Sequence, residues 1–244
     1  MIKRFFYLFI ALGIAISCTT KPTPLDATAF RGKTFLFYNP ADSISFYVDF
    51  KDSICNEIDF DSRNYPWELK TDEGNDFLII GEVVYGIKKD EKANAFTVRA
   101  LANKDRSFTV SEVEPKWDKE KLYGTWINEE ADSTDRDISL KLPPLDPPIA
   151  IYEEVWPPEY RIEKDMIYSY DLDTRSKSKY RLSHSNTFMQ MHLDTPNWFQ
   201  YTYQWEITLV NDSILELTGK SFQEMKPLEE SFTEEKIILK KKKE

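Results

Sequence analysis

The chain has 244 residues, of which 42 are Asp or Glu and 32 are Lys or Arg, so its formal net charge is −10. This acidic balance argues against a nucleic-acid partner, because that kind of binding depends on Lys and Arg contacts with phosphate. Hydrophobic residues make up 41% of the chain and aromatic residues 14%, which is enough for a buried core in one large domain or two small ones.

The start of the chain combines positive charge with a short apolar run. Two cationic residues precede the apolar stretch 5–16, and a small residue and then Cys18 follow it. A spanning helix needs about 20 apolar residues, so a run this short is typical of a secretory signal. We therefore predict a signal peptide over 1–17. Thr and Pro residues then predict an extended tether over 18–24, with no core to bury.

The residues that end this apolar run, Ala15, Ile16, Ser17 and Cys18, resemble a bacterial lipobox. The resemblance implies a lipoprotein of the Bacteroidetes type, whose cysteine carries palmitate-like acyl chains and so anchors the protein to a membrane. In such bacteria, surface export goes with acidic residues just after the cysteine, and this chain has none before Asp26. We therefore expect the periplasmic face of the cell outer membrane. The alternative is an ordinary signal peptide in which the cysteine stands by chance.

Alternation of apolar and polar residues with a period of two dominates the rest of the chain. It is clear in SISFYVDF at 43–50 and in YTYQWEITL at 201–209, and turn-forming residues separate such runs. The pattern predicts an all-β protein of antiparallel, meandering strands, in which closure into a barrel removes exposed edges. We expect two tandem units, an N-terminal β unit over 25–116 and a C-terminal β-barrel unit over 117–244.

Two pairs of similar stretches point to an internal repeat. Residues 30–34 and 122–126 each place an apolar residue two positions before a glycine and a strand. A second pair of hairpins begins at Trp67 and Trp205, with a larger offset than the first pair. A duplication therefore requires extra residues in the second copy, for which the acidic, proline-rich stretch 131–158 is the candidate. Chance similarity of two hairpins remains the alternative.

The motif Gly124-x-Trp126 resembles the first strand of lipocalin-like domains. The resemblance implies an up-and-down β-barrel over roughly 117–244, in which Trp126 plugs the floor. In the first unit, Thr34 stands where the tryptophan would be. For that unit the sequence leaves open a true barrel or a smaller, flatter sheet.

No pattern in the sequence indicates catalysis, a cofactor or a metal. His184 and His192 are the only histidines, and we expect them to be solvated or hydrogen-bonded rather than metal ligands. The acidic run 132–137 lacks the central glycine and closing glutamate of a calcium loop. Glu153 and Glu154 are neighbours on an expected strand, so they point to opposite faces and cannot flank one bond. We therefore predict a protein that is not an enzyme.

Cys55 is left without a partner once Cys18 is acylated. In the stretch SICNEIDF, Cys55 shares its strand face with Glu57, whereas Ile54 and Ile58 share the other face. We therefore expect Cys55 to point outward and to have no role. An intermolecular disulfide or a reactive thiol are the alternatives.

The stretch 142–160 contains three Pro-Pro pairs around apolar and aromatic residues. Proline pairs stiffen the backbone and remove hydrogen-bond donors. Three interpretations remain open: a lid over a ligand, a docking surface, or a core strand with proline-stopped ends. Tyr152 and Trp156 share a face if this segment is extended, and they are the candidate ligand-binding or partner-binding residues.

These observations predict a lipid-anchored, non-enzymatic protein of the cell envelope that binds a small apolar or amphiphilic ligand. The alternative is an interaction or assembly lipoprotein with no small ligand. The expected partners are the membrane, through acylated Cys18, and a small apolar ligand or an envelope protein. A carrier should have an under-filled barrel, whereas a structural module should have a packed interior.

Overall fold

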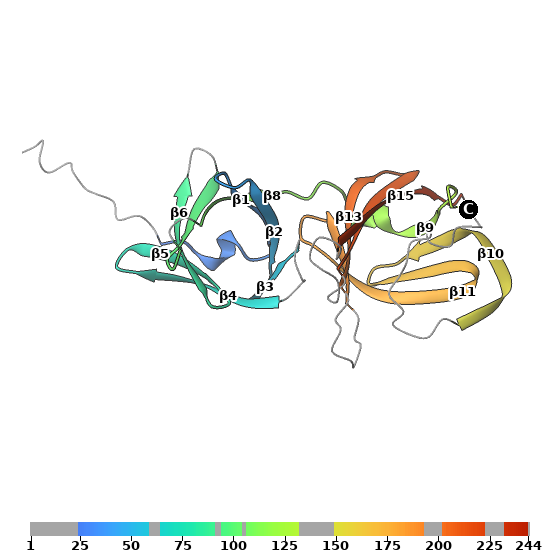
Figure 1. Cartoon of the computed structure of the whole chain (residues 1–244), viewed down its shortest axis with the longest axis horizontal. Coiled ribbons are helices and arrows are strands. Elements are labelled where there is room, and N and C mark those ends of the chain that lie inside the picture. The colour runs from blue at the N-terminus through green and yellow to red at the C-terminus, as the bar shows by residue number, and fades with distance from the viewer. Residues whose placement is uncertain are drawn as a thin grey trace, which may run out of the picture.

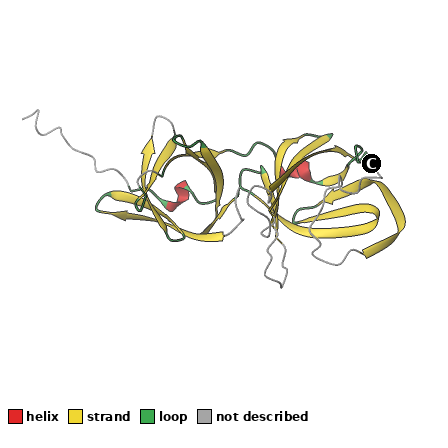
Figure 2. Cartoon of the chain, in the orientation of Figure 1, coloured by secondary structure: helices red, strands yellow, loops and turns green. Residues whose placement is uncertain are grey.

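A computed structural model of the chain describes residues 24–58, 64–90, 94–103, 106–131, 149–192, 202–222 and 232–243. These residues form two closed β-barrels that lie side by side along the long axis (Figure 1), and two 3-10 turns are the helical elements in these ranges (Figure 2). The predicted all-β, antiparallel fold with two tandem barrel-like units is confirmed. None of the described helices is long and apolar enough to cross a bilayer. The predicted signal peptide, most of the tether and Cys18 lie outside the described residues.

The first barrel is a meander of eight strands. Its elements are η1 (Ala27–Ala29), β1 (Lys33–Asn39), β2 (Ile44–Phe50), β3 (Ile54–Glu57), β4 (Asn64–Asp72), β5 (Asn75–Ile80), β6 (Val83–Asp90), β7 (Ala95–Ala100) and β8 (Ser107–Val113). Each strand pairs antiparallel with the next, and β8 pairs with β1, with Thr34 opposite Val113, to close the ring. The first unit is therefore a closed barrel and not a flatter sheet.

The second barrel has seven described strands. Its elements are η2 (Lys119–Leu122), β9 (Gly124–Ile127), β10 (Ile149–Ile162), β11 (Met166–Leu182), β12 (Phe188–His192), β13 (Thr202–Val210), β14 (Ile214–Phe222) and β15 (Phe232–Lys241). The strands from β10 to β15 follow one another around the ring, and β9 closes it by pairing with both β10 and β15. The described part of the proline-framed stretch is thus a strand of the barrel wall.

Both barrels begin with the same local device. Asp26 caps η1 and Asp118 caps η2, and each carboxylate accepts a hydrogen bond from the backbone amide two residues further on. Phe30 directly follows η1 and Leu122 is the last residue of η2, so each lies four residues after the capping aspartate, and both are fully buried inside their barrels. The repeat predicted from the sequence at these two places therefore corresponds to one recurring structure, a capped turn that inserts an apolar side chain.

After this turn, the positions that point into the barrel differ by one residue between the two units. Gly32 and Gly124 both have positive φ angles, 73° and 131°, a conformation that glycine adopts readily. In the second barrel Trp126 then points inward, whereas Thr34 is buried on the outer face of the first barrel. Phe35 is the first inward aromatic side chain of β1, so it occupies the place inside the first barrel that Trp126 occupies inside the second.

The second pair of similar hairpins does not occupy matching places. Trp67 lies on β4, the fourth strand of the first barrel, whereas Trp205 lies on β13, the fifth described strand of the second barrel. Both side chains are buried in the core of their own barrel. The two hairpins therefore share a local pattern without sharing a position in the ring.

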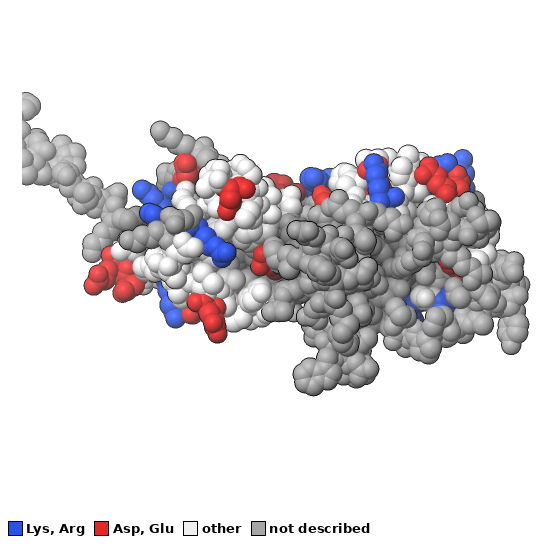
Figure 3. Space-filling view, viewed as in Figure 1, with Lys and Arg blue, Asp and Glu red and all other residues white. Residues whose placement is uncertain are grey.

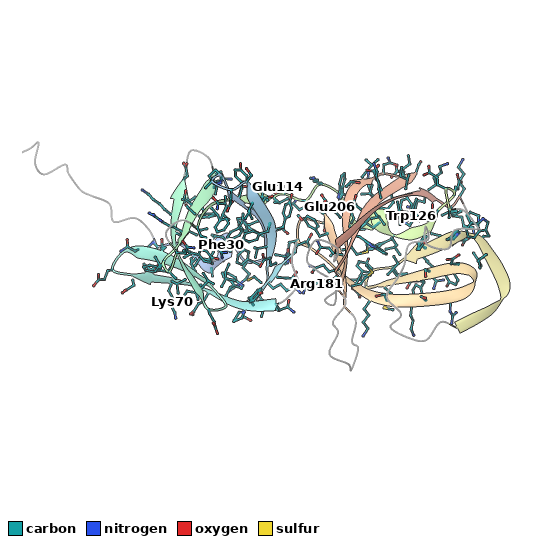
Figure 4. All side chains as sticks on the ribbon, viewed as in Figure 1. Phe30, Lys70, Glu114, Trp126, Arg181 and Glu206 are labelled. Carbon is teal, nitrogen blue, oxygen red and sulfur yellow. The ribbon has the colours of Figure 1, made fainter. Side chains whose placement is uncertain are left out.

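Trp126 lies in the core of the second barrel, next to the turn that starts it (Figure 4). Its indole N–H donates a hydrogen bond of 2.8 Å to the carbonyl oxygen of Leu122, and its exposed fraction is 0%. The Lys241 ammonium lies 5.1 Å from the centre of the ring. The indole thereby joins the capped turn, the first strand and the last strand of the barrel.

We predict that Trp126→Ala lowers the free energy of unfolding of the second barrel by about 3–5 kcal/mol, as loss of a large buried aromatic side chain does. Guanidinium unfolding followed by circular dichroism measures this loss. Trp156→Ala is the matched control, because Trp156 lies in the same barrel but is 39% exposed. Equal losses in the two variants would contradict the assignment of Trp126 as the central core residue.

Candidate functional site

A cavity of about 730 Å³ lies in the first barrel. Its wall is largely apolar and is formed by side chains of β1 to β6 and of β8, among them Phe37, Phe46, Val48, Ile80 and Phe108. These residues lie toward the end of the barrel that carries the β1–β2 and β5–β6 turns. The cavity therefore opens at that end of the barrel.

The opposite end of the first barrel is filled by a cluster of aromatic rings. Phe30 follows η1, which lies within the ring of strands (Figure 1), and its ring centre is 4.7 Å from that of Phe35 and 4.8 Å from that of Phe96. Phe50 and Trp67 complete the cluster, with ring centres 5.0 Å apart. None of these five residues lines the cavity. The cluster is therefore a floor, and the cavity is the space between this floor and the mouth.

Charged side chains contribute to the wall near the mouth. Asp42 lies in the β1–β2 turn, Glu82 lies in the β5–β6 turn, and Glu57 ends β3. Arg106, just before β8, is the cation among the described residues that line the cavity. The site thus combines an apolar interior with a polar entrance, an arrangement that is typical of pockets for small ligands.

Cys55 points into the cavity and is 1% exposed, so the prediction that it points outward is wrong. The prediction treated the apolar face of β3 as the inner face. The outer face of β3 is also covered, because Asn56 contacts the second barrel. Burial raises the pKa of the Cys55 thiol to about 12, and the nearby charge of Glu57 adds to this effect. Cys55 is therefore a protonated wall residue at neutral pH and not a reactive thiolate.

The outer faces of β1 and β2 bind the β11–β12 turn of the second barrel through a buried carboxylate. Oδ1 of Asp49 accepts hydrogen bonds from the backbone N–H of His184 at 2.8 Å and from the hydroxyl of Thr34 at 2.7 Å, and Nδ1 of His184 lies 3.0 Å away. The hydroxyl of Thr34 accepts in turn from the backbone N–H of Ser185 at 2.9 Å. These groups tie the two barrels together at a polar junction.

Two further contacts extend the junction toward β3. The side-chain amide of Gln190 on β12 donates a hydrogen bond of 2.7 Å to Oδ1 of Asn56, and its carbonyl oxygen accepts one of 2.7 Å from Arg181. The rings of Tyr47 and Phe188 pack with their centres 4.7 Å apart. Figure 4 shows Arg181 at this boundary between the barrels. The junction is therefore a mixed polar and aromatic contact.

The connector between the barrels is held by the same turn. The side-chain amide of Asn186 donates a hydrogen bond of 2.9 Å to the backbone carbonyl of Trp117, which lies between β8 and η2. Asn186 itself has a positive φ angle of 56°, a conformation that asparagine tolerates better than most residues. The β11–β12 turn thus contacts both the wall of the first barrel and the segment that leads out of it.

The candidate residues predicted from the sequence are not among the described residues that line the cavity. Trp156 lies on β10 of the second barrel and does not belong to the described cavity wall, and the side chain of Tyr152 lies outside the described part. His184 is hydrogen-bonded at the junction, whereas the side chain of His192 is also outside the described part. Within the described ranges, no three His, Cys, Asp or Glu residues gather as a metal site. The structure therefore does not bring these candidates together.

The sequence pattern contains the cavity residues without marking them as a site. The alternation in 43–50 places Ile44, Phe46, Val48 and Phe50 on one face of a strand. The first three of them line the cavity, and Phe50 belongs to the floor. Along this face, the side chains of the other strands that lie opposite determine which residues line the cavity and which belong to the floor. The alternation within one strand does not contain that information.

The comparisons with known proteins identify no relative. No family model matches the chain, and no curated protein or solved structure matches it. The two closed antiparallel barrels are compatible with lipocalin-like barrels. Any functional assignment therefore depends on the geometry of this chain.

We predict that Asp49→Asn destabilises the chain by about 1–3 kcal/mol near neutral pH, because the amide lacks the negative charge that strengthens the hydrogen bonds from His184 and Thr34, and its NH₂ group would place a buried donor where Oδ2 has no partner. Burial alone would raise the pKa of Asp49, but the bonds from His184 and Thr34 outweigh it, so the pKa is lowered in the folded state. The stabilisation is therefore present above the unfolded pKa of about 4 and is lost as the pH falls through the lowered folded value.

The gap in melting temperature between wild type and Asp49→Asn should consequently narrow between about pH 5 and pH 3. The control is Asp52→Asn, since Asp52 follows the same strand but its side chain is 95% exposed. A gap that stays constant with pH, or an equal gap for Asp52→Asn, would refute the role of the Asp49 carboxylate at the junction.

Proposed function

We propose that this chain is a lipid-anchored, non-enzymatic protein of the cell envelope that binds a small apolar or amphiphilic ligand inside its first barrel. The observation that carries the proposal is the cavity of about 730 Å³ above the aromatic floor. Pockets that bind small molecules have volumes of about 300–1,000 Å³ and are lined mainly by apolar and aromatic side chains. The size and the lining of this cavity both fit that class.

The partial filling of the first barrel supports a carrier over a purely structural module. In the first barrel, the aromatic cluster fills only the floor end, and the apolar side chains above it line the cavity. An under-filled barrel is what binding of a small ligand requires. A barrel whose role is only to fold and to dock would keep a packed interior.

The membrane anchor in this proposal comes from the lipobox-like residues before Cys18. Acyl chains on that cysteine would add about 0.8 kcal/mol of membrane affinity for each buried CH₂ group, and two or more chains give a stable anchor. The proposed location is the periplasmic face of the outer membrane, in a bacterium of the Bacteroidetes type. A tether over 18–24 would keep the first barrel close to the bilayer, where apolar ligands concentrate.

A second candidate is an envelope interaction or assembly lipoprotein that docks through the second barrel. The observation in its favour is Trp156, an exposed tryptophan on the proline-framed strand β10. Tryptophan provides large contact areas in protein interfaces. This candidate predicts loss of an envelope partner in Trp156→Ala and no binding of small apolar probes by wild type.

We predict that Ile80→Trp, which places a larger ring in the cavity, weakens binding of the neutral apolar probe N-phenyl-1-naphthylamine by about tenfold or more, because the ligand and the ring compete for the same space. Ile79→Trp is the matched control. Adjacent residues of a strand point to opposite sides, and Ile79 does not line the cavity. Probe fluorescence measures both affinities. Equal binding by the two variants would exclude the cavity as the binding site.

We predict that Cys18→Ser moves the protein from the detergent phase to the aqueous phase in a phase-partition experiment, because the variant lacks the proposed site of acylation. Ser17→Ala is the control, since it keeps a small residue before the cysteine and should stay in the detergent phase. If wild type and Cys18→Ser partition equally, the chain is not anchored through this residue.

A further inference from the structure

Among the described residues that line the cavity, carboxylates outnumber cations. Three carboxylates line it, those of Asp42, Glu57 and Glu82, against the single guanidinium of Arg106 among the described lining residues. Asp42 and Glu82 lie in the two turns that border the mouth, and Glu57 projects from the end of β3. Below them the wall is apolar down to the aromatic floor. A ligand that fills the cavity would therefore place its tail in the interior and its head among these carboxylates.

One of these carboxylates, that of Glu57, also affects side chains inside the barrel. Burial raises the pKa of Tyr85, and Glu57 raises it further, while Arg106 lowers it to a smaller extent. Glu57 also contributes to the raised pKa of Cys55. The charge that these two wall residues experience is therefore negative on balance. Interactions between charges are stronger in such a partly enclosed site than in bulk water.

The mouth also carries exposed apolar side chains. Ile44 is 53% exposed and Val83 is 41% exposed, and both line the cavity beside the acidic turns. An apolar rim of this kind lets an alkyl chain pass between the bilayer or solvent and the interior without crossing a fully polar surface. The entrance thus combines apolar contacts for a tail with negative charge for a head group.

An anionic amphiphile such as a fatty acid fits this entrance poorly. Its carboxylate would lie among three like charges with one guanidinium to pair with, and partial burial makes such repulsion costly. We infer that the cavity takes an amphiphile whose head group carries a cationic nitrogen, with the tail against Phe46, Val48 and Phe108 and the nitrogen between Glu57 and Glu82. This inference rests on the proposed function and adds the class of ligand to it.

Competition between amphiphiles that share one tail tests the inference. The protein is residues 19–244, which contain every described residue of both barrels. Dodecyltrimethylammonium, dodecylphosphocholine and dodecyl sulfate, each below its micellar concentration, compete with N-phenyl-1-naphthylamine. We expect the trimethylammonium head to bind about tenfold more tightly than the sulfate, through attraction that salt screens. The phosphocholine arm shows whether a zwitterionic head with the same nitrogen is also accepted, in which case its affinity lies between the other two.

Variants at the mouth assign the preference to individual charges. Glu57→Gln and Glu82→Gln should each reduce the ratio between the two charged heads, and Arg106→Gln should increase it. Glu68→Gln is the control, because Glu68 lies on the outer side of β4, where it pairs with Lys70 at 2.7 Å, and does not line the cavity. Since Glu57 lies on a strand of the wall, Glu82→Gln in the exposed turn keeps the test valid if Glu57→Gln does not fold.

The outcomes separate this inference from the proposed function. If wild type binds the neutral probe but shows no preference for the cationic head, or prefers the sulfate, the ligand class is wrong and the carrier function stands. A preference that is unchanged in both Glu57→Gln and Glu82→Gln also overturns the inference. If wild type does not bind the neutral probe at all, the carrier function itself fails and the inference fails with it.

Discussion

Strands β2 and β3 carry buried side chains on both faces. The inner side chains line the cavity and the outer ones contact the second barrel, so the arrangement of the two barrels depends on these strands. Val48 and Cys55 face the cavity, whereas their neighbours Asp49 and Asn56 bond to the second barrel. A strand turns successive side chains to opposite faces, so one short segment serves as the wall of the cavity and as the docking surface for the other barrel. Any shift of this wall would break buried hydrogen bonds, at a cost of about 1–3 kcal/mol for each polar group left unsatisfied.

The polar character of the junction explains how two barrels can adopt one arrangement. Apolar contact alone is not directional, whereas the carboxylate of Asp49 accepts bonds from two sides, one from its own barrel through Thr34 and one from the second barrel through His184. Oδ2 of the same carboxylate is buried without a hydrogen-bond partner. Arg181 and Lys51 lie close enough for Asp49 to affect their pKa values, so cationic charge compensates the buried anion. Misplacing the second barrel would remove the charge of Arg181 and the hydrogen bond from His184 and leave only Lys51 of the first barrel to compensate this anion.

The parts of the structure that could be predicted from the sequence are those set by local pattern. Alternation along 43–50 and 201–209 predicts strands, and the similarity between 30–34 and 122–126 predicts a repeat, which corresponds to the capped turn that begins each barrel. Closure of the first barrel was left open because it depends on pairing between Thr34 and Val113, which lie far apart in the chain. Local alternation carries no information about which distant strand supplies that pairing.

The orientation of Cys55 shows why the candidate site could not be found in the same way. Alternation identifies two faces of a strand, and the inner face is normally recognised as the apolar one. On β3 polarity does not separate inside from outside. Glu57 is inward at the cavity, whereas apolar Ile54 is outward and exposed and polar Asn56 is outward and buried against the second barrel. The position of the second barrel decides the assignment, and that position depends on contacts between β3 and a strand more than a hundred residues later. Where the wall of the cavity is also an interface, the alternation of apolar and polar residues therefore does not identify its inner face.

The two barrels begin alike but place different aromatic side chains after the capped turn. After the capped turn, the second barrel places the indole of Trp126 across its interior and joins it to Leu122 and Lys241. The first barrel places the smaller ring of Phe35 against Phe30 at the floor. The wall above that floor is built from residues such as Val48 and Ile80, which line a cavity instead of meeting across it. The same capped turn can thus be followed by a large indole that contacts the last strand, as in the second barrel, or by a layer of smaller rings with a cavity above it, as in the first.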